Sequence, residues 1–95
     1  MPELKTSYLV EAAYVEGAAE KRGPYREDHL ARLEKLAGEG VLVVAGALAD
    51  LSASVFILSV HSEDAVKAIV ETDAYWKGGV WTDYSIRKMN RVIFE

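Results

Sequence analysis

Two segments with helical periodicity, each enclosed by segments with strand periodicity, constrain the fold of this chain most strongly. The first predicted helix begins at Gly23-Pro24 and ends before Gly38, since proline suits the first helical position and glycine the cap that ends a helix. The second begins after Ser62, a residue type that caps helix N-termini, and ends before Asp73. The apolar faces are formed by Leu30, Leu33, Leu36 and Ala37 in the first helix and by Ala65, Val66, Ile69 and Val70 in the second.

Strand patterns occupy most of the remaining chain. They cover residues 6–15, 41–48, 54–60 and 81–88, with a short terminal strand at 91–94, a polar connection at 16–22 and a glycine-bearing loop at 76–79. The order is strand, helix, two strands, helix and strand, which is typical of the ferredoxin-like α+β fold with one antiparallel sheet and both helices on one face. We therefore expect a single domain over residues 1–95.

The strands are apolar on both faces. In the first strand one face carries Tyr8 and Val10, and the other carries Leu9 and Ala13. Residues 41–48 are apolar throughout, as expected of a strand that is covered on both sides. With 51% of its residues hydrophobic, so small a chain has more apolar surface than two helices can hide, and such a surface usually marks association. We expect a homodimer, or a higher homo-oligomer, that packs sheet against sheet.

Charge and composition exclude several function classes. The net charge is −4, and no basic patch marks a surface for nucleic acid. The chain has no cysteine, no pair of histidines at metal-binding spacing and no glycine-rich phosphate loop, so we expect neither a metal nor another cofactor. No apolar run is long enough to span a bilayer, and Met1–Lys5 lacks an apolar signal segment, which favours a cytoplasmic protein without membrane contact.

His29 is the first candidate for chemistry. It shares a helical stripe with Leu33 and Leu36, so its imidazole points toward the core or its border. Histidine titrates near neutral pH, which suits proton transfer. Arg26 lies one turn earlier, where it either holds an anion such as a substrate carboxylate or is a surface cation near Glu27. The alternative is a border histidine whose ring bonds a backbone carbonyl or solvent.

Asp73 is the second candidate, because it follows the end of a predicted helix. There a carboxylate faces the negative end of the helix dipole, which is unfavourable. One reading is a turn carboxylate that accepts hydrogen bonds from nearby backbone N–H groups. The other is an acid/base pair in which Asp73 meets His29 in a pocket and orients it.

A glycine and several aromatic residues complete the predicted pocket. Gly46 interrupts an apolar strand, which indicates either a bulge or room for a ligand beside His29. Tyr75, Trp76 and Trp81, with Tyr84 nearby, form either part of the core and dimer contact or an aromatic wall for a planar small molecule.

At these residues the chain resembles a known family. The pattern Arg26-x-x-His29-Leu30-x-x-Leu33, then Gly40 and Gly46-x-Leu48, then a helix ending in Asp73, is similar to the YCII-related (YciI-like) family. The resemblance implies the dimeric α+β barrel and a pocket holding one histidine and one aspartate, which correspond to His29 and Asp73. The family usually has proline after this aspartate, whereas Ala74 stands here, so the turn is less rigid.

Similarity to muconolactone isomerases and to dehydrochlorinase-type members of this family suggests proton transfer or elimination on small, often aromatic-derived molecules. The leading hypothesis is a cofactor-free lyase or isomerase that uses His29 and Asp73. One alternative is a dimeric binding or accessory protein that holds a metabolite without turnover. Another is a purely structural dimer, in which the two residues stay unpaired.

Overall fold

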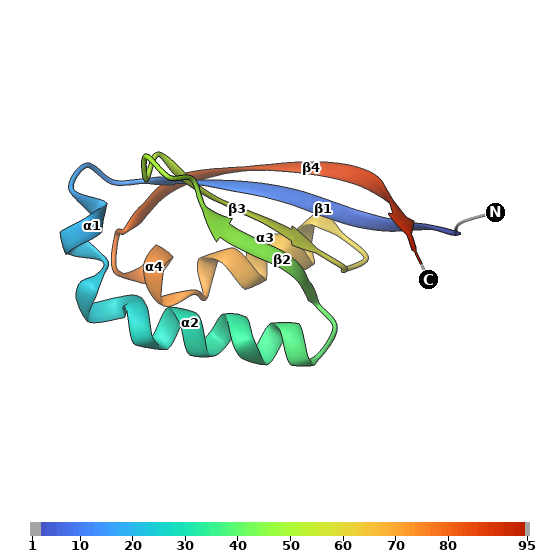
Figure 1. Cartoon of the computed structure of the whole chain (residues 1–95), viewed down its shortest axis with the longest axis horizontal. Helices are drawn as coiled ribbons and strands as arrows, with labels where there is room; N and C mark the ends of the chain where they lie inside the picture. The colour runs from blue at the N-terminus through green and yellow to red at the C-terminus, as the bar shows by residue number, and fades with distance from the viewer. Residues whose placement is uncertain (1–2, 95) are drawn as a thin grey trace.

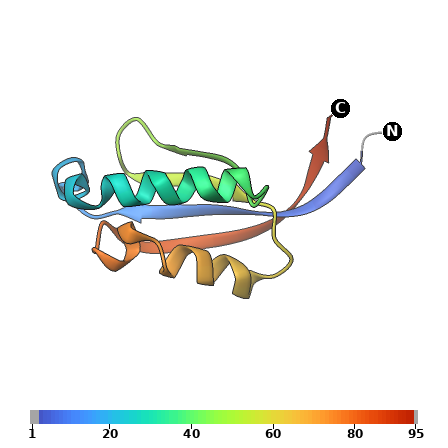
Figure 2. The same cartoon turned by 90° about the horizontal axis from the view of Figure 1, so that it is seen from below.

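A four-stranded antiparallel sheet carries helices α2, α3 and α4 on one of its faces (Figures 1 and 2). The computed structural model describes residues 3–94, so Met1, Pro2 and Glu95 lie outside the described residues. The strand order is β2-β3-β1-β4. In chain order the elements are β1 (Glu3–Tyr14), α1 (Ala18–Lys21), α2 (Gly23–Gly38), β2 (Leu42–Ala47), β3 (Ala53–Leu58), α3 (Glu63–Glu71), α4 (Ala74–Lys77) and β4 (Trp81–Ile93). The predicted ferredoxin-like α+β arrangement is confirmed.

Two local predictions differ from the structure. The two strands expected after residue 80 are one continuous strand, β4, because β1 begins as early as Glu3 and supplies pairing partners as far as Ile93. Of the residues expected to form the loop at 76–79, Trp76 and Lys77 belong to the short helix α4, and Gly78 and Gly79 follow it. The polar connection at 16–22 contains the helical turn α1, entered through Gly17 at φ 75°, a left-handed conformation that glycine adopts without steric cost.

The core lies between the sheet and helices α2, α3 and α4. Its buried members from the sheet include Val10, Phe56 and Leu58, and α3 contributes Val66 and Val70. Ser62 caps α3 as predicted, because its hydroxyl accepts a hydrogen bond from the Ala65 N–H at 3.1 Å. No helix within residues 3–94 combines the length and apolar character needed to cross a membrane.

Strand β2 is not covered on both faces within the chain, and that prediction was wrong. Only Leu42 is buried, whereas Val43 and Val44 are 42% and 54% exposed. The reason is topological, since β2 lies at the edge of the sheet and pairs with β3 alone. An exposed apolar edge strand is an aggregation hazard unless something covers it.

The sheet face opposite the helices carries apolar side chains on β2 and β3 and at Leu9 of β1, whereas Glu11 of β1 lies beside Val55 on the same face. Leu9 lies beside Ile57 in the register, and Val44 lies beside Ile57 from the other side. Ile57 is half-buried, whereas Val10 points to the helices and is fully buried. A second copy packed on this face remains the expected cover.

The expected dimer is tested by Ile57→Asp. We expect wild type to sediment as a dimer at micromolar concentration and Ile57→Asp to sediment as a folded monomer, because an unpaired buried carboxylate is costly in an interface. Ala31→Asp, on the exposed side of α2, is the matched control and should stay dimeric. Val10→Asp should unfold the chain instead. A monomeric wild type would contradict the expectation.

Candidate active site

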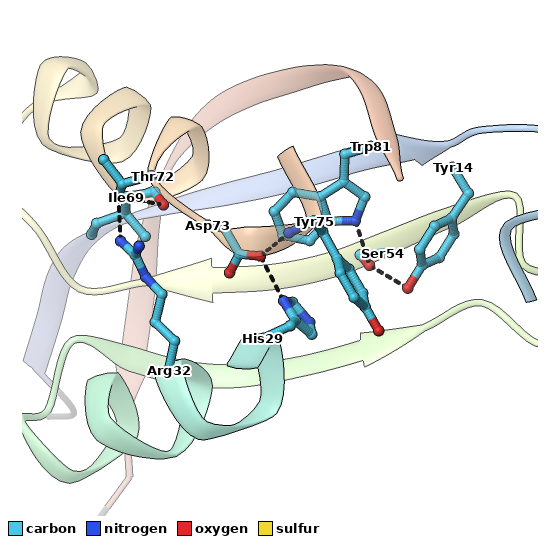
Figure 3. Close-up of polar contacts among 9 residues, drawn as sticks. All are labelled: Tyr14, His29, Arg32, Ser54, Ile69, Thr72, Asp73, Tyr75 and Trp81. Atoms are coloured by element: carbon cyan, nitrogen blue, oxygen red, sulfur yellow. Dashed lines mark hydrogen bonds and ion pairs between the residues drawn. The ribbon is translucent and has the colours of Figure 1, made fainter. Parts of the chain in front are cut away.

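His29 and Asp73 meet on the helix-covered side of the sheet (Figure 3). The stripe that α2 buries against the core places His29 inward, at 6% exposure. Asp73 lies between α3 and α4 at 3% exposure. The His29 Nδ1 is 2.8 Å from Asp73 Oδ1, so the predicted approach of the two side chains is present.

The backbone explains why Asp73 faces His29. Helix α3 ends at Glu71, and Asp73 adopts an extended conformation, φ −72° and ψ 145°, as the N-cap of α4. Its Oδ1 accepts a second hydrogen bond from the Tyr75 N–H at 2.8 Å. Asp73 therefore caps the start of one helix rather than opposing the end of another, which corrects the predicted dipole penalty. Asp73 is therefore both a turn carboxylate that accepts a backbone hydrogen bond and the partner of His29.

This pairing determines which imidazole nitrogen is free. An ionised carboxylate only accepts hydrogen bonds, so Nδ1 of His29 carries the hydrogen and donates it. In the neutral ring Nε2 is then the unprotonated nitrogen. No group within residues 3–94 bonds Nε2 of His29, and those residues leave no fully buried side-chain nitrogen or oxygen without a partner. The free nitrogen therefore has access to the adjoining cavity.

Two aromatic side chains fix the plane of the imidazole. The Tyr75 ring stacks on His29 with centroids 3.7 Å apart and planes 10° from parallel. The Trp81 ring meets His29 edge to face at 5.3 Å. Tyr75 is 2% exposed and Trp81 is 3% exposed. Burial raises the pKa of the Tyr75 hydroxyl, and the nearby Tyr14 raises it further, whereas the cations Arg22 and Arg26 lower it.

A cavity of about 170 Å³ lies beside His29. Arg26 and Gly46, both predicted to bind substrate, border it together with Tyr75 and Trp81. A Cβ added to Gly46 would meet nothing within 4 Å, and the register shift in β2 falls between Leu42 and Val44 instead. Packing within the chain therefore does not require glycine at position 46.

Trp76 is the predicted pocket residue that the structure places elsewhere. It does not border the cavity, and its ring packs edge to face on Tyr84 at 5.2 Å. Neighbouring residues on a helix point about 100° apart, because a turn has 3.6 residues. Tyr75 therefore faces His29 while Trp76 faces β4. The Tyr84 hydroxyl donates to Glu71, and burial together with this bond raises its pKa to about 12.

Sequence reasoning missed three polar residues that border the cavity: Tyr14, Arg22 and Ser54. Trp81 Nε1 donates to Ser54 Oγ at 3.1 Å, and Ser54 Oγ donates to the Tyr14 hydroxyl at 2.8 Å. The available signal was the strand periodicity, which places Tyr14 on the same face as Tyr8 and Val10. Residues 3–94 bring together no group of three or more His, Cys, Asp or Glu that could hold a metal ion.

Comparisons with known proteins agree on one family. The pattern of the YCII-related domain matches residues 6–90. Protein YciI of Escherichia coli O6:H1 is 30% identical, over 90% of this chain and 97% of the relative. An uncharacterized protein of Haemophilus influenzae shows the same identity and coverage.

A solved structure has a similar fold. It is 5-chloro-2-hydroxyhydroquinone dehydrochlorinase from Burkholderia phenoliruptrix AC1100, in complex with 2,5-dihydroxybenzoquinone. The TM-score is 0.74 at 24% sequence identity, and the match covers 85% of this chain and 90% of that one.

The double role of Asp73 leads to a stability prediction. Asp73→Ala removes the α4 cap and leaves the buried His29 Nδ1–H without an acceptor, so we expect it to lower the free energy of unfolding by roughly 2–4 kcal/mol. Asp73→Asn keeps an oxygen that accepts both bonds and should cost about 1 kcal/mol. Asp28→Ala, an exposed aspartate on α2, is the control and should change little. Equal urea midpoints for Asp73→Ala and wild type would contradict the capping role.

Proposed function

This chain belongs to the YCII-related domain family, and from that premise we propose that it is a small cofactor-free enzyme of the lyase or isomerase type. In the proposal, the whole chain 1–95 is one such domain and works as a homodimer. His29 transfers the proton and Asp73 orients it. The observation that carries the proposal is the buried bond from His29 Nδ1 to Asp73, which leaves Nε2 as the nitrogen available to a ligand in the adjoining cavity.

The proposed chemistry begins with a proton on carbon next to a carbonyl. Nε2 of His29 takes this proton. The electron pair of the C–H bond forms a double bond to the carbonyl carbon, and the π pair of the carbonyl moves onto its oxygen to give an enolate. The enolate then either expels a leaving group from the neighbouring carbon or is protonated at another carbon by the same imidazolium. Asp73 stabilises the imidazolium between the two steps. Proton transfer by a positioned side chain contributes about 10²–10⁴-fold in rate.

The cavity favours a small planar acid as substrate. Its volume of about 170 Å³ is close to the roughly 150 Å³ in which an engineered protein cavity holds benzene. Tyr75 and Trp81 offer aromatic faces, and Arg22 and Arg26 offer cations at the border. The structurally similar dehydrochlorinase binds 2,5-dihydroxybenzoquinone, which is a planar acid of this size and a suitable probe for this chain.

Hydrogen exchange on this probe tests the proposal without assuming a leaving group. Each ring C–H of 2,5-dihydroxybenzoquinone lies between an enol carbon and a carbonyl carbon, so a proton can be added there and the original one removed. We expect wild type in D2O to accelerate loss of the ring-proton NMR signal. His29→Gln should lower the rate by about 10²–10⁴-fold. His61→Gln, an exposed histidine outside the cavity, is the control and should leave the rate unchanged.

Binding of the probe separates the proposal from the non-catalytic alternative. A bound ligand must raise the melting temperature by mass action. A wild type that binds the probe but exchanges no faster than His29→Gln would contradict catalysis and favour a binding protein. Arg26→Ala should weaken binding, since it removes a cation from the cavity border.

A further inference from the structure

A chain of hydrogen bonds ends at the cavity opposite the histidine–aspartate pair. It runs from Trp81 Nε1 to Ser54 Oγ at 3.1 Å and from Ser54 Oγ to the Tyr14 hydroxyl oxygen at 2.8 Å (Figure 3). Trp81 and Ser54 are 3% and 5% exposed, and Tyr14 is half-buried. All three side chains border the cavity that His29 borders. The chain is polar and shielded, and no step described above uses it.

The first bond of this chain has only one possible direction. An indole N–H can only donate, so Ser54 Oγ is the acceptor of that bond. In the second bond Ser54 donates its hydroxyl hydrogen to the oxygen of Tyr14. The Tyr14 oxygen accepts this bond and still has its own O–H to donate. Residues 3–94 supply no acceptor for that O–H. A hydroxyl that already accepts a hydrogen bond is polarised and donates more strongly.

Other groups near the Tyr14 hydroxyl also suit an oxygen carrying negative charge. Figure 3 shows the hydroxyls of Tyr14 and Tyr75 on the same side of the Trp81 ring. Tyr14, Arg22, Arg26 and Tyr75 all border the cavity. Besides burial, Tyr14 raises the pKa of the Tyr75 hydroxyl, and Arg22 and Arg26 lower it. The border of the cavity thus carries hydroxyl groups and guanidinium cations as well as the imidazole of His29.

We propose that Tyr14 donates a hydrogen bond to the oxygen of the substrate on which negative charge develops, and that Ser54 and Trp81 act as positioning residues that orient and polarise it. This inference rests on the proposed function. It adds the group that stabilises the substrate oxygen while His29 removes the proton. It also narrows the substrate class to planar molecules with a carbonyl or enolate oxygen at the Tyr14 end and an exchangeable C–H at the His29 end. Preorganised donors of this kind act on charge that forms only in the transition state.

Conservative variants test Tyr14 with the same coloured probe. We expect Tyr14→Phe to lower the exchange rate on 2,5-dihydroxybenzoquinone by about 10²-fold, with a smaller change in affinity. The absorption band of the bound probe should move toward that of the free probe, because a bond to its oxygen is lost. Tyr84→Phe is the matched control, since its hydroxyl is engaged by Glu71 outside the cavity, and it should behave as wild type.

Ser54 variants test the relay itself, that is, the chain of hydrogen bonds from Trp81 through Ser54 to Tyr14. Ser54→Ala should lower the exchange rate and shift the absorption band of the bound probe in the same direction as Tyr14→Phe, but by less. Ser54→Thr should restore the rate and the band. In a Tyr14→Phe background, Ser54→Ala should change neither any further. Urea midpoints identify any variant that loses folding. A folded Tyr14→Phe that exchanges at the wild-type rate with an unchanged band would overturn the proposal while leaving the function of His29 intact.

A readout without ligand keeps the two proposals separable. The indole N–H resonance of Trp81 should move in Tyr14→Phe and in Ser54→Ala, because the bond chain polarises it. If wild type neither binds the probe nor exchanges it, the proposed function fails for this substrate class, and the Trp81 resonance still decides whether the relay exists. An unmoved resonance in both variants would overturn the relay.

Discussion

The rest of the site depends on one carboxylate oxygen that accepts two buried hydrogen bonds. Asp73 Oδ1 receives the Nδ1–H of His29 from α2 and the backbone N–H of Tyr75 from α4, each at 2.8 Å. The oxygen therefore ties the longest helix to the junction between α3 and α4. It also keeps the His29 ring beside the Tyr75 ring, because the His29 imidazole and the Tyr75 backbone both bond to this atom. Buried polar groups are costly when unpaired and rigidify a site when satisfied. Stability and imidazole orientation are thus joined at Asp73.

The same arrangement explains how a chain with so modest a core can hold an ionisable pair. The sheet and three helices surround Asp73, while the edge strand β2 borders the cavity beside His29 through residues such as Gly46. Nδ1 of His29 is held by Asp73, and Nε2 is left free for proton transfer to or from a ligand. Trp81 contacts both functional groups, because its ring meets His29 edge to face and its N–H begins the hydrogen-bond chain to Tyr14.

Periodicity predicted the helices, the order of helices and strands along the chain and the inward direction of His29, because these follow from which residues must be buried. Four features of the structure could not be predicted from periodicity. A four-residue helix such as α4 is too short to show a period, so the capping role of Asp73 was hidden and Trp76 was assigned to the wrong side. The continuity of β4 depends on a partner strand rather than on its own residues. The bond between Ser54 and Tyr14 joins residues 40 apart in the chain, and only the strand register brings them together.

The central claim is that Asp73 fixes the tautomer of His29 and leaves Nε2 free to transfer a proton. Nitrogen NMR of the imidazole tests it most directly, with His61→Gln used to assign the signals of the two histidines. In the neutral ring we expect Nδ1 of His29 to carry the hydrogen and Nε2 to be unprotonated, and we expect Asp73→Ala to mix the two tautomers. A neutral His29 protonated at Nε2, with the same tautomer in Asp73→Ala, would contradict the claim.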